Sequence, residues 1–97
     1  MAAPRGFPRR LSLLRQEWEV HYAAELDHAF GLCSDDKRLI LIAADQSPES
    51  MADTLTHEVI HAYDAMLRIG LSEEQTVLLA VAWLDYQRGN KPVGGGK

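Results

Sequence analysis

The stretch Thr56-His57-Glu58-Val59-Ile60-His61 decides how the rest of the chain is interpreted, because it has the pattern H-E-x-x-H. On a helix, side chains four residues apart lie on one face, one turn apart. His57 and His61 would therefore direct two imidazoles at one place, with a spacing that suits two ligands of a zinc ion. Glu58 is rotated away from that stripe and would reach a water molecule on the metal more easily than the metal itself. The pattern thus supplies two metal ligands and a base, as metal-assisted hydrolysis requires.

The flanking sequence predicts a long helix around this motif. Ser47-Pro48-Glu49 is typical of a helix start, with serine as N-cap, proline in the first turn and an acid beside it. The helix is expected to cover residues 48–69, and Gly70 is a natural stop. One apolar stripe is expected to face the core, and it consists of Met51, Leu55, Val59, Ala62 and Met66.

The first half of the chain predicts a small sheet. Residues 18–22 alternate, with Trp18, Val20 and Tyr22 on one face, and are expected to form a half-buried strand. Residues 29–34 and 38–43 are predicted as two strands of a hairpin, joined by a polar turn. The second of these is the most apolar run, so we expect it to be central, or an edge strand covered on both faces. Residues 9–17 are predicted as a short helix.

The last helix is the expected source of a third metal ligand. Ser72 with Gln75 three residues later forms a capping-box pattern that starts this helix. Its apolar stripe, expected to pack on the preceding helix, consists of Val77, Leu78, Val81 and Leu84, with Ala80 as a further candidate member. Glu74 begins that stripe and is the predicted ligand, whereas Glu73 is expected in solvent, where it favours the helix dipole. The same dipole role is the alternative for Glu74.

Three other acids stay open as alternatives to Glu74, namely Glu73, Asp64 and Asp85. The longer pattern H-E-x-x-H-x-x-G-x-x-H is not met, because Asp64 and Leu67 stand where it needs glycine and histidine. The third ligand is therefore expected outside the motif's own segment. Asp64 is close enough to the histidine stripe to contact the site, but a supporting or surface position suits it better.

Composition sets the broad class. The chain has 97 residues, which predicts one domain over residues 9–90, a flexible arm over 1–8 and a disordered tail over 91–97. A net charge of −4 gives no reason to expect nucleic-acid binding. No apolar run is long enough to predict a membrane span, and a cytoplasmic location is expected. Cys33 is the single cysteine, so no intramolecular disulfide can form, and it is expected to be a small buried residue of a strand.

Two segments carry a resemblance to a known group: T-L-T-H-E-V-I-H-A-Y-D and G-L-S-E-E-Q-T-V-L-L-A-V-A-W-L-D-Y-Q-R-G-N. Together with the strand at 38–43 they resemble the small zincin-like metallopeptidases of phages and prophages, which are related to the ImmA/IrrE and SprT-like zincins. The resemblance implies an α+β, minimal zincin-like fold with a sheet of about three strands, an active-site helix and a backing helix. It also implies zinc on His57 and His61, Glu58 as catalytic acid/base, and Glu74 as the third ligand.

The predicted function is zinc-dependent hydrolysis of peptide bonds in a peptide or protein substrate. The substrate is expected to pair with the strand at 38–43 if that strand is an edge. A phenol from Tyr22, Tyr63 or Tyr86 is a candidate to hold the oxyanion. One alternative is a zinc-stabilised interaction protein without catalysis, such as a phage or prophage regulatory module, and another is an interaction domain without metal. The sequence predicts neither the cleavage preference nor the oligomeric state.

Overall fold

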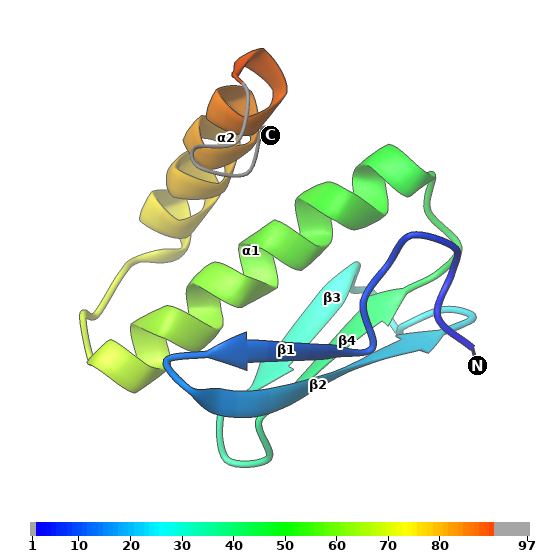
Figure 1. Ribbon diagram of the computed structural model, residues 1–97, viewed down its shortest axis with the longest axis horizontal. Helices are drawn as coiled ribbons and strands as arrows, with labels where there is room; N and C mark the ends of the chain where they lie inside the picture. The colour runs from blue at the N-terminus through cyan, green and yellow to red at the C-terminus, as the bar shows by residue number, and fades with distance from the viewer. Residues whose placement is uncertain (1, 91–97) are drawn as a thin grey trace, which may run out of the picture.

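One mixed sheet of four strands forms the base of the molecule in the computed structural model, which describes residues 2–90 (Figure 1). The strands lie in the order β1-β2-β4-β3. Their bounds are Arg10–Leu13 for β1, Gln16–Ala23 for β2, Gly31–Ser34 for β3 and Leu39–Ala43 for β4. β2 and β4 run parallel, and the two outer pairs are antiparallel. The α+β class is therefore confirmed, with one strand more than the sequence predicts.

The alternation in β2 places its apolar face on the core, as predicted. Trp18, Val20 and Tyr22 are 0%, 2% and 4% exposed, while the residues between them are exposed. The parallel register pairs Val20 with Ile40 and Tyr22 with Ile42, so the two central strands present one continuous apolar face. The core of the molecule lies on that face.

The predicted helix over residues 9–17 is wrong. This segment forms β1, a two-residue turn and the start of β2, with Leu13 paired to Gln16. Leu14 and Arg15 form the turn with φ of 51° and 64°, a left-handed pair that matches the twist of a tight hairpin. Leucine and arginine are not the usual residues of such a turn, so the sequence lacks the signal that asparagine or glycine would give.

The predicted hairpin of β3 and β4 is confirmed, and β4 is a central strand. β4 pairs with β2 on one side and with β3 on the other. Substrate pairing along β4 is expected only if β4 is an edge strand. Because β4 is central, that condition is not met. The edge on this side of the sheet is β3.

Helix α1, Pro48–Leu67, lies across the apolar face of the sheet (Figure 1). The Ser47 side chain accepts a hydrogen bond from the backbone of Ser50 at 3.1 Å, which confirms the predicted cap. The helix ends two residues earlier than predicted, because Arg68 adopts a left-handed conformation. The predicted core stripe is confirmed, because Met51 and Ala62 are buried and its other members pack partly buried against the core.

Helix α2, Glu73–Gly89, packs on α1, on the side away from the sheet (Figure 1). Its capping box at Ser72 is present as predicted. The predicted packing stripe is wrong in part: Ala80 is buried and Leu84 is half-buried, but the other buried residue of α2 is Thr76, which the stripe did not include. Val77, Leu78 and Val81 are 44%, 60% and 60% exposed. The side of α2 that packs on α1 is therefore not the one predicted. The sequence carries no information on where α1 lies relative to α2.

The segment before β1 is in contact with the core. Ala3 and Phe7 pack against the buried cluster, and the Phe7 ring meets Tyr22 edge-on. The Tyr22 hydroxyl donates a hydrogen bond to the backbone oxygen of Pro8. The predicted tail over residues 91–97 lies outside the described residues. Within residues 2–90, no helix is long and apolar enough to cross a membrane.

Candidate metal centre

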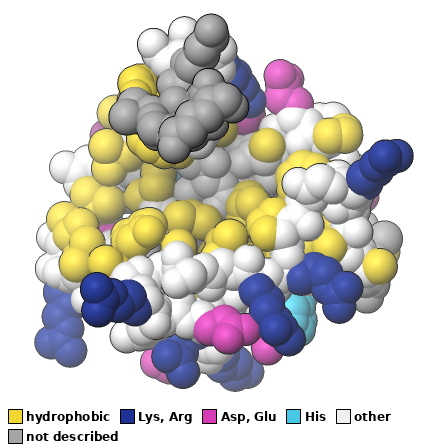
Figure 2. Space-filling view, in the orientation of Figure 1, with side chains coloured by type: hydrophobic (Ala, Val, Ile, Leu, Met, Phe, Trp, Pro, Cys, Tyr) yellow, Lys and Arg dark blue, Asp and Glu magenta, His cyan; other side chains and the backbone are white. Residues whose placement is uncertain are grey.

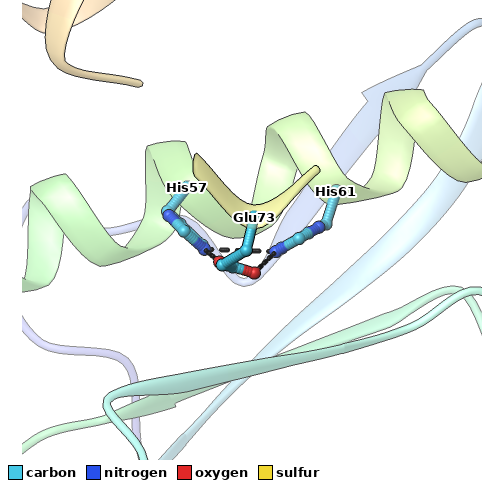
Figure 3. Close-up of side chains that lie close together, drawn as sticks. All are labelled: His57, His61 and Glu73. Carbon is cyan, nitrogen blue, oxygen red and sulfur yellow. Dashed lines mark hydrogen bonds and ion pairs between the residues drawn. The ribbon is translucent and has the colours of Figure 1, made fainter. Parts of the chain in front are cut away.

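His57 and His61 project from one face of α1 and converge at their tips (Figure 3). Their Nε2 atoms are 3.1 Å apart, and the ring centroids are 4.7 Å apart with the planes at 73°. The two side chains are 23% and 29% exposed, so the pair is partly sheltered but open to a small ligand. The helical spacing of four residues thus brings the two imidazoles together, as the sequence predicts.

Glu73, the first residue of α2, places its carboxylate between the two imidazoles (Figure 3). One oxygen, Oε1, lies 2.7 Å from Nε2 of His57, and the other, Oε2, lies 3.3 Å from Nε2 of His61. Both histidines therefore contact the same carboxylate, which comes from the neighbouring helix.

The linker between the helices fixes where Glu73 stands. Asp64, near the end of α1, accepts hydrogen bonds at its Oδ1 from the backbone of Gly70 at 2.7 Å and of Leu71 at 3.1 Å. The capping box of Ser72 and Gln75 then sets the first turn of α2. Asp64 is thus a supporting residue, as the sequence favours, and it holds the linker.

The three residues fit a divalent metal ion. One donor atom from each of His57, His61 and Glu73 lies within 4.8 Å of the others. Zinc bonds of about 2.0 to 2.1 Å in a tetrahedron imply donor atoms about 3.3 Å apart. The two imidazole Nε2 atoms, 3.1 Å apart, are close to that spacing, and each of them has one oxygen of Glu73 at 2.7 or 3.3 Å. Two imidazoles and one carboxylate are also a donor set that suits zinc.

The structure brings Glu73, and not Glu74, to the two histidines. Residues 73, 76 and 80 share the side of α2 that faces α1, and the last two of them are buried. Both Glu73 and Glu74 are exposed, but Glu74 is one position further round the helix and is not among the donors that converge. Asp85 lines a separate hollow beside Val81 and Arg88. The choice of Glu74 rested on the wrong packing stripe, and correcting the stripe makes Glu73 the candidate ligand.

Glu58 lies beside this trio in a buried position. Glu58 is only 6% exposed, and this burial raises the pKa of its carboxyl above the ordinary value. Nearby His57 and His61 act in the opposite direction, and the charge of Glu73 raises the pKa further. A buried carboxyl with a raised pKa is typical of a group that accepts and returns a proton near neutral pH.

Gly31 on β3 makes room for Glu58. A Cβ atom at this position would lie 2.6 Å from Cγ2 of Thr54 and 3.2 Å from Oε2 of Glu58. Only glycine lets the carboxylate lie so close to the backbone of β3. Gln46 also holds this end of β3, because its Nε2 donates to the backbone oxygen of Phe30 at 3.1 Å.

The trio and Glu58 line one cavity of about 520 Å³ between α1 and β3. Its other lining residues are Gly31, Leu32, Cys33, Asp35, Asp64 and Ala65. The sequence analysis did not predict that β3 lines the cavity. A glycine inside an apolar strand can indicate that another group lies close to the backbone there, and Gly31 is such a glycine. None of the three tyrosines proposed for the oxyanion lines the cavity, and Tyr63 and Tyr86 line a different groove.

Comparisons with known proteins identified no relative of this chain. No protein-family model matches the chain, and no curated protein and no solved structure matches it.

Proposed function

We propose that this protein is a zinc-dependent peptidase whose metal is held by His57, His61 and Glu73. The observation that carries the proposal is the meeting of two imidazoles from α1 and one carboxylate from α2 at a single point. A buried carboxylate, Glu58, lies in the same cavity. This set of three ligands and one base is what metal-assisted hydrolysis uses.

Glu58 is the proposed general base and acid. A zinc ion bound to the trio would act as a Lewis acid toward a carbonyl oxygen and would make a water molecule more acidic. Glu58 takes the proton from the attacking water and returns it to the leaving amine. Its raised pKa favours this exchange, because a carboxyl with an ordinary pKa holds a proton too weakly at neutral pH. His57 and His61 act only as ligands in this scheme.

The proposed place for a peptide substrate is the outer edge of β3. The backbone oxygen of Phe30 accepts a hydrogen bond from Ala43 at 2.8 Å, so at this residue the backbone is paired with the neighbouring strand. Backbone groups alternate along an antiparallel strand, and those of Gly31 and Cys33 therefore face outward. A substrate strand added there would lie against the cavity that holds Glu58.

A cytoplasmic location stays a prediction.

The test is Glu58→Gln in protein purified without chelators and loaded with zinc. We expect the wild type to cleave a fluorescence-quenched unfolded protein, and the variant to lose at least about a hundredfold in rate. The variant should keep its zinc, because Glu58 is not one of the ligands. Glu49→Gln is the matched control, since Glu49 is an exposed acid of the same helix and should leave the rate unchanged.

Two results would overturn the proposal. Equal cleavage by wild type and Glu58→Gln would show that the activity belongs to something else in the sample. A wild type that holds zinc but cleaves no substrate would instead identify the trio as a structural site that stabilises a small core.

A further inference from the structure

Two hollows of the molecule differ in character. The larger one, about 770 Å³, is an apolar groove between α1 and α2, and Figure 2 shows hydrophobic side chains gathered on the face that these helices form. The cavity at the candidate metal centre is acidic instead, because Asp35, Glu58, Asp64 and Glu73 line it. No lysine or arginine of the described residues lines that cavity. The cavity therefore favours a positively charged group of a ligand over a negatively charged one.

Three of these four acids are already engaged. Glu73 contacts both imidazoles, Asp64 holds the linker between the helices, and Glu58 is the proposed base. At Asp35 the hydrogen bond within residues 2–90 goes to the backbone oxygen, from the backbone of Arg38 at 3.3 Å, and the exposed carboxylate has no partner there. A bound divalent ion would balance the charges of Glu58 and Glu73 but not that of Asp35. Asp35 is therefore available to a group of the substrate.

Asp35 directly follows β3 and continues the side of that strand that faces α1. A Cβ atom at Gly31 would lie against Thr54 and Glu58, so positions 31 and 33 of the strand face α1. Position 35 is the next in this alternation, and Gly31, Cys33 and Asp35 all line the cavity. Asp35 thus ends this row, about 13 Å along the strand from Gly31.

The charge of Asp35 acts inside the cavity. The pKa of the Cys33 thiol is raised to about 11, chiefly by burial, next by the charge of Glu58 and then by that of Asp35. A negative charge that destabilises a thiolate at this place stabilises a cation there. A substrate side chain beside Cys33 would therefore experience an attraction toward Asp35 if it were positively charged.

We propose that Asp35 is a specificity-determining residue that selects a lysine or arginine side chain of the peptide substrate. The inference rests on the proposed function, and on the edge of β3 as the place for the substrate. A strand added at that edge places one substrate residue opposite position 35. Directly opposed side chains on one face have Cβ atoms about 5 Å apart, so an ammonium or guanidinium group there meets the Asp35 carboxylate.

The position of the basic residue in the substrate follows from the direction of the added strand. An antiparallel pair is slightly more stable per residue than a parallel one, so we expect the substrate to run antiparallel to β3. It then passes Asp35 first and Gly31 afterwards, where Glu58 lies against the strand. The basic residue is therefore expected on the N-terminal side of the cleaved bond, within about four residues of it.

The first test measures binding without cleavage. Zinc-loaded Glu58→Gln protein is titrated into short peptides of serine, threonine and valine that carry an uncharged fluorescent label and either one lysine or one glutamine at their centre. Fluorescence anisotropy should show that the lysine peptide binds about fivefold more tightly, as an exposed ion pair allows. Asp35→Asn in the same background should remove this difference. Asp36→Asn is the matched control and should keep it, because Asp36 is an exposed acid of the same turn that is not among the residues lining the cavity.

The second test uses cleavage. The zinc-loaded wild type digests a reduced and alkylated unfolded protein, and mass spectrometry of the fragments identifies the residues around each cut. Lysine and arginine should be enriched about fivefold on the N-terminal side of the cut. Asp35→Lys should replace this by an enrichment of aspartate and glutamate, without loss of zinc, because the charge at this position is reversed.

The outcomes separate this inference from the proposed function. Equal binding of the two peptides, no binding of either, or a lysine preference that persists in Asp35→Asn would overturn the role of Asp35. A lysine preference that Asp35→Asn abolishes, in a protein whose wild type cleaves nothing, would support that role and count against the peptidase activity alone.

Discussion

Cys33 shows how the cavity changes the chemistry of a single residue. Its side chain lines the same cavity as Glu58, and it is half-buried. Burial is the largest cause that raises the pKa of the thiol, to about 11, and the charges of Glu58 and Asp35 raise it further. The thiol is therefore protonated, and poorly nucleophilic, at neutral pH.

This gives a prediction for thiol alkylation in the metal-free protein. At pH 8 Cys33 should react roughly fiftyfold more slowly in the folded protein than in urea, because only the thiolate reacts. Raising the pH toward 11 increases the thiolate fraction, so the rate should rise about tenfold per pH unit until the pKa is reached. Mass spectrometry of the alkylated chain measures both rates. Equal rates at pH 8 in the folded and unfolded protein would contradict the raised pKa.

The residues of the candidate centre differ in how well the sequence predicts them. His57 and His61 are four residues apart on one helix, and local geometry alone brings them together. Glu73 cannot be predicted in this way, because its position depends on how α2 is rotated against α1 and on the course of the linker. The apolar residues of α2 misled the prediction, since Val77, Leu78 and Val81 are exposed whereas the buried residues are Thr76 and Ala80.

At the scale of elements, the linker between α1 and α2 positions the centre. Asp64 takes both linker hydrogen bonds with one carboxylate oxygen, so it sets the direction in which α2 begins. The Glu73 carboxylate also contacts both imidazoles directly, at 2.7 and 3.3 Å. The linker and these contacts together place Glu73 at the candidate centre.

Asp64→Ala should weaken zinc binding by about tenfold, because α2 loses the two hydrogen bonds that place Glu73. Asp64→Asn keeps an oxygen acceptor at the same position and should bind zinc about as tightly as the wild type. Titration of the metal-free proteins with zinc and a competing chelator measures both affinities. If Asp64→Asn is as weak as Asp64→Ala, the charge of Asp64 matters and the hydrogen bonds do not.

The elements themselves follow from the sequence to different degrees. Capped helices and the alternating strand β2 are predicted because serine caps and period-two patterns act locally. The strand β1 is not, because four residues and a turn of Leu14 and Arg15 carry no local signal. Pairing with β2 stabilises that segment, and this tertiary effect overrides local preference.

At the scale of the whole molecule, the sheet determines where a substrate can bind. The order β1-β2-β4-β3 makes β3 an edge beside the cavity and encloses the more apolar β4. Apolar content indicates that β4 is central, but no feature of the sequence predicts the parallel pairing of β2 with β4. The proposed position of the substrate therefore depends on topology, which had to be observed.

Metal content is the most direct measurement of the central claim, that His57, His61 and Glu73 hold one zinc ion. Wild type, Glu73→Gln and Glu74→Gln are purified without chelators, and their zinc is determined by elemental analysis. The account predicts one zinc per chain in the wild type and in Glu74→Gln, and much less in Glu73→Gln, because Glu73, and not Glu74, reaches the imidazoles. A wild type without zinc, or a full complement in Glu73→Gln, would contradict it.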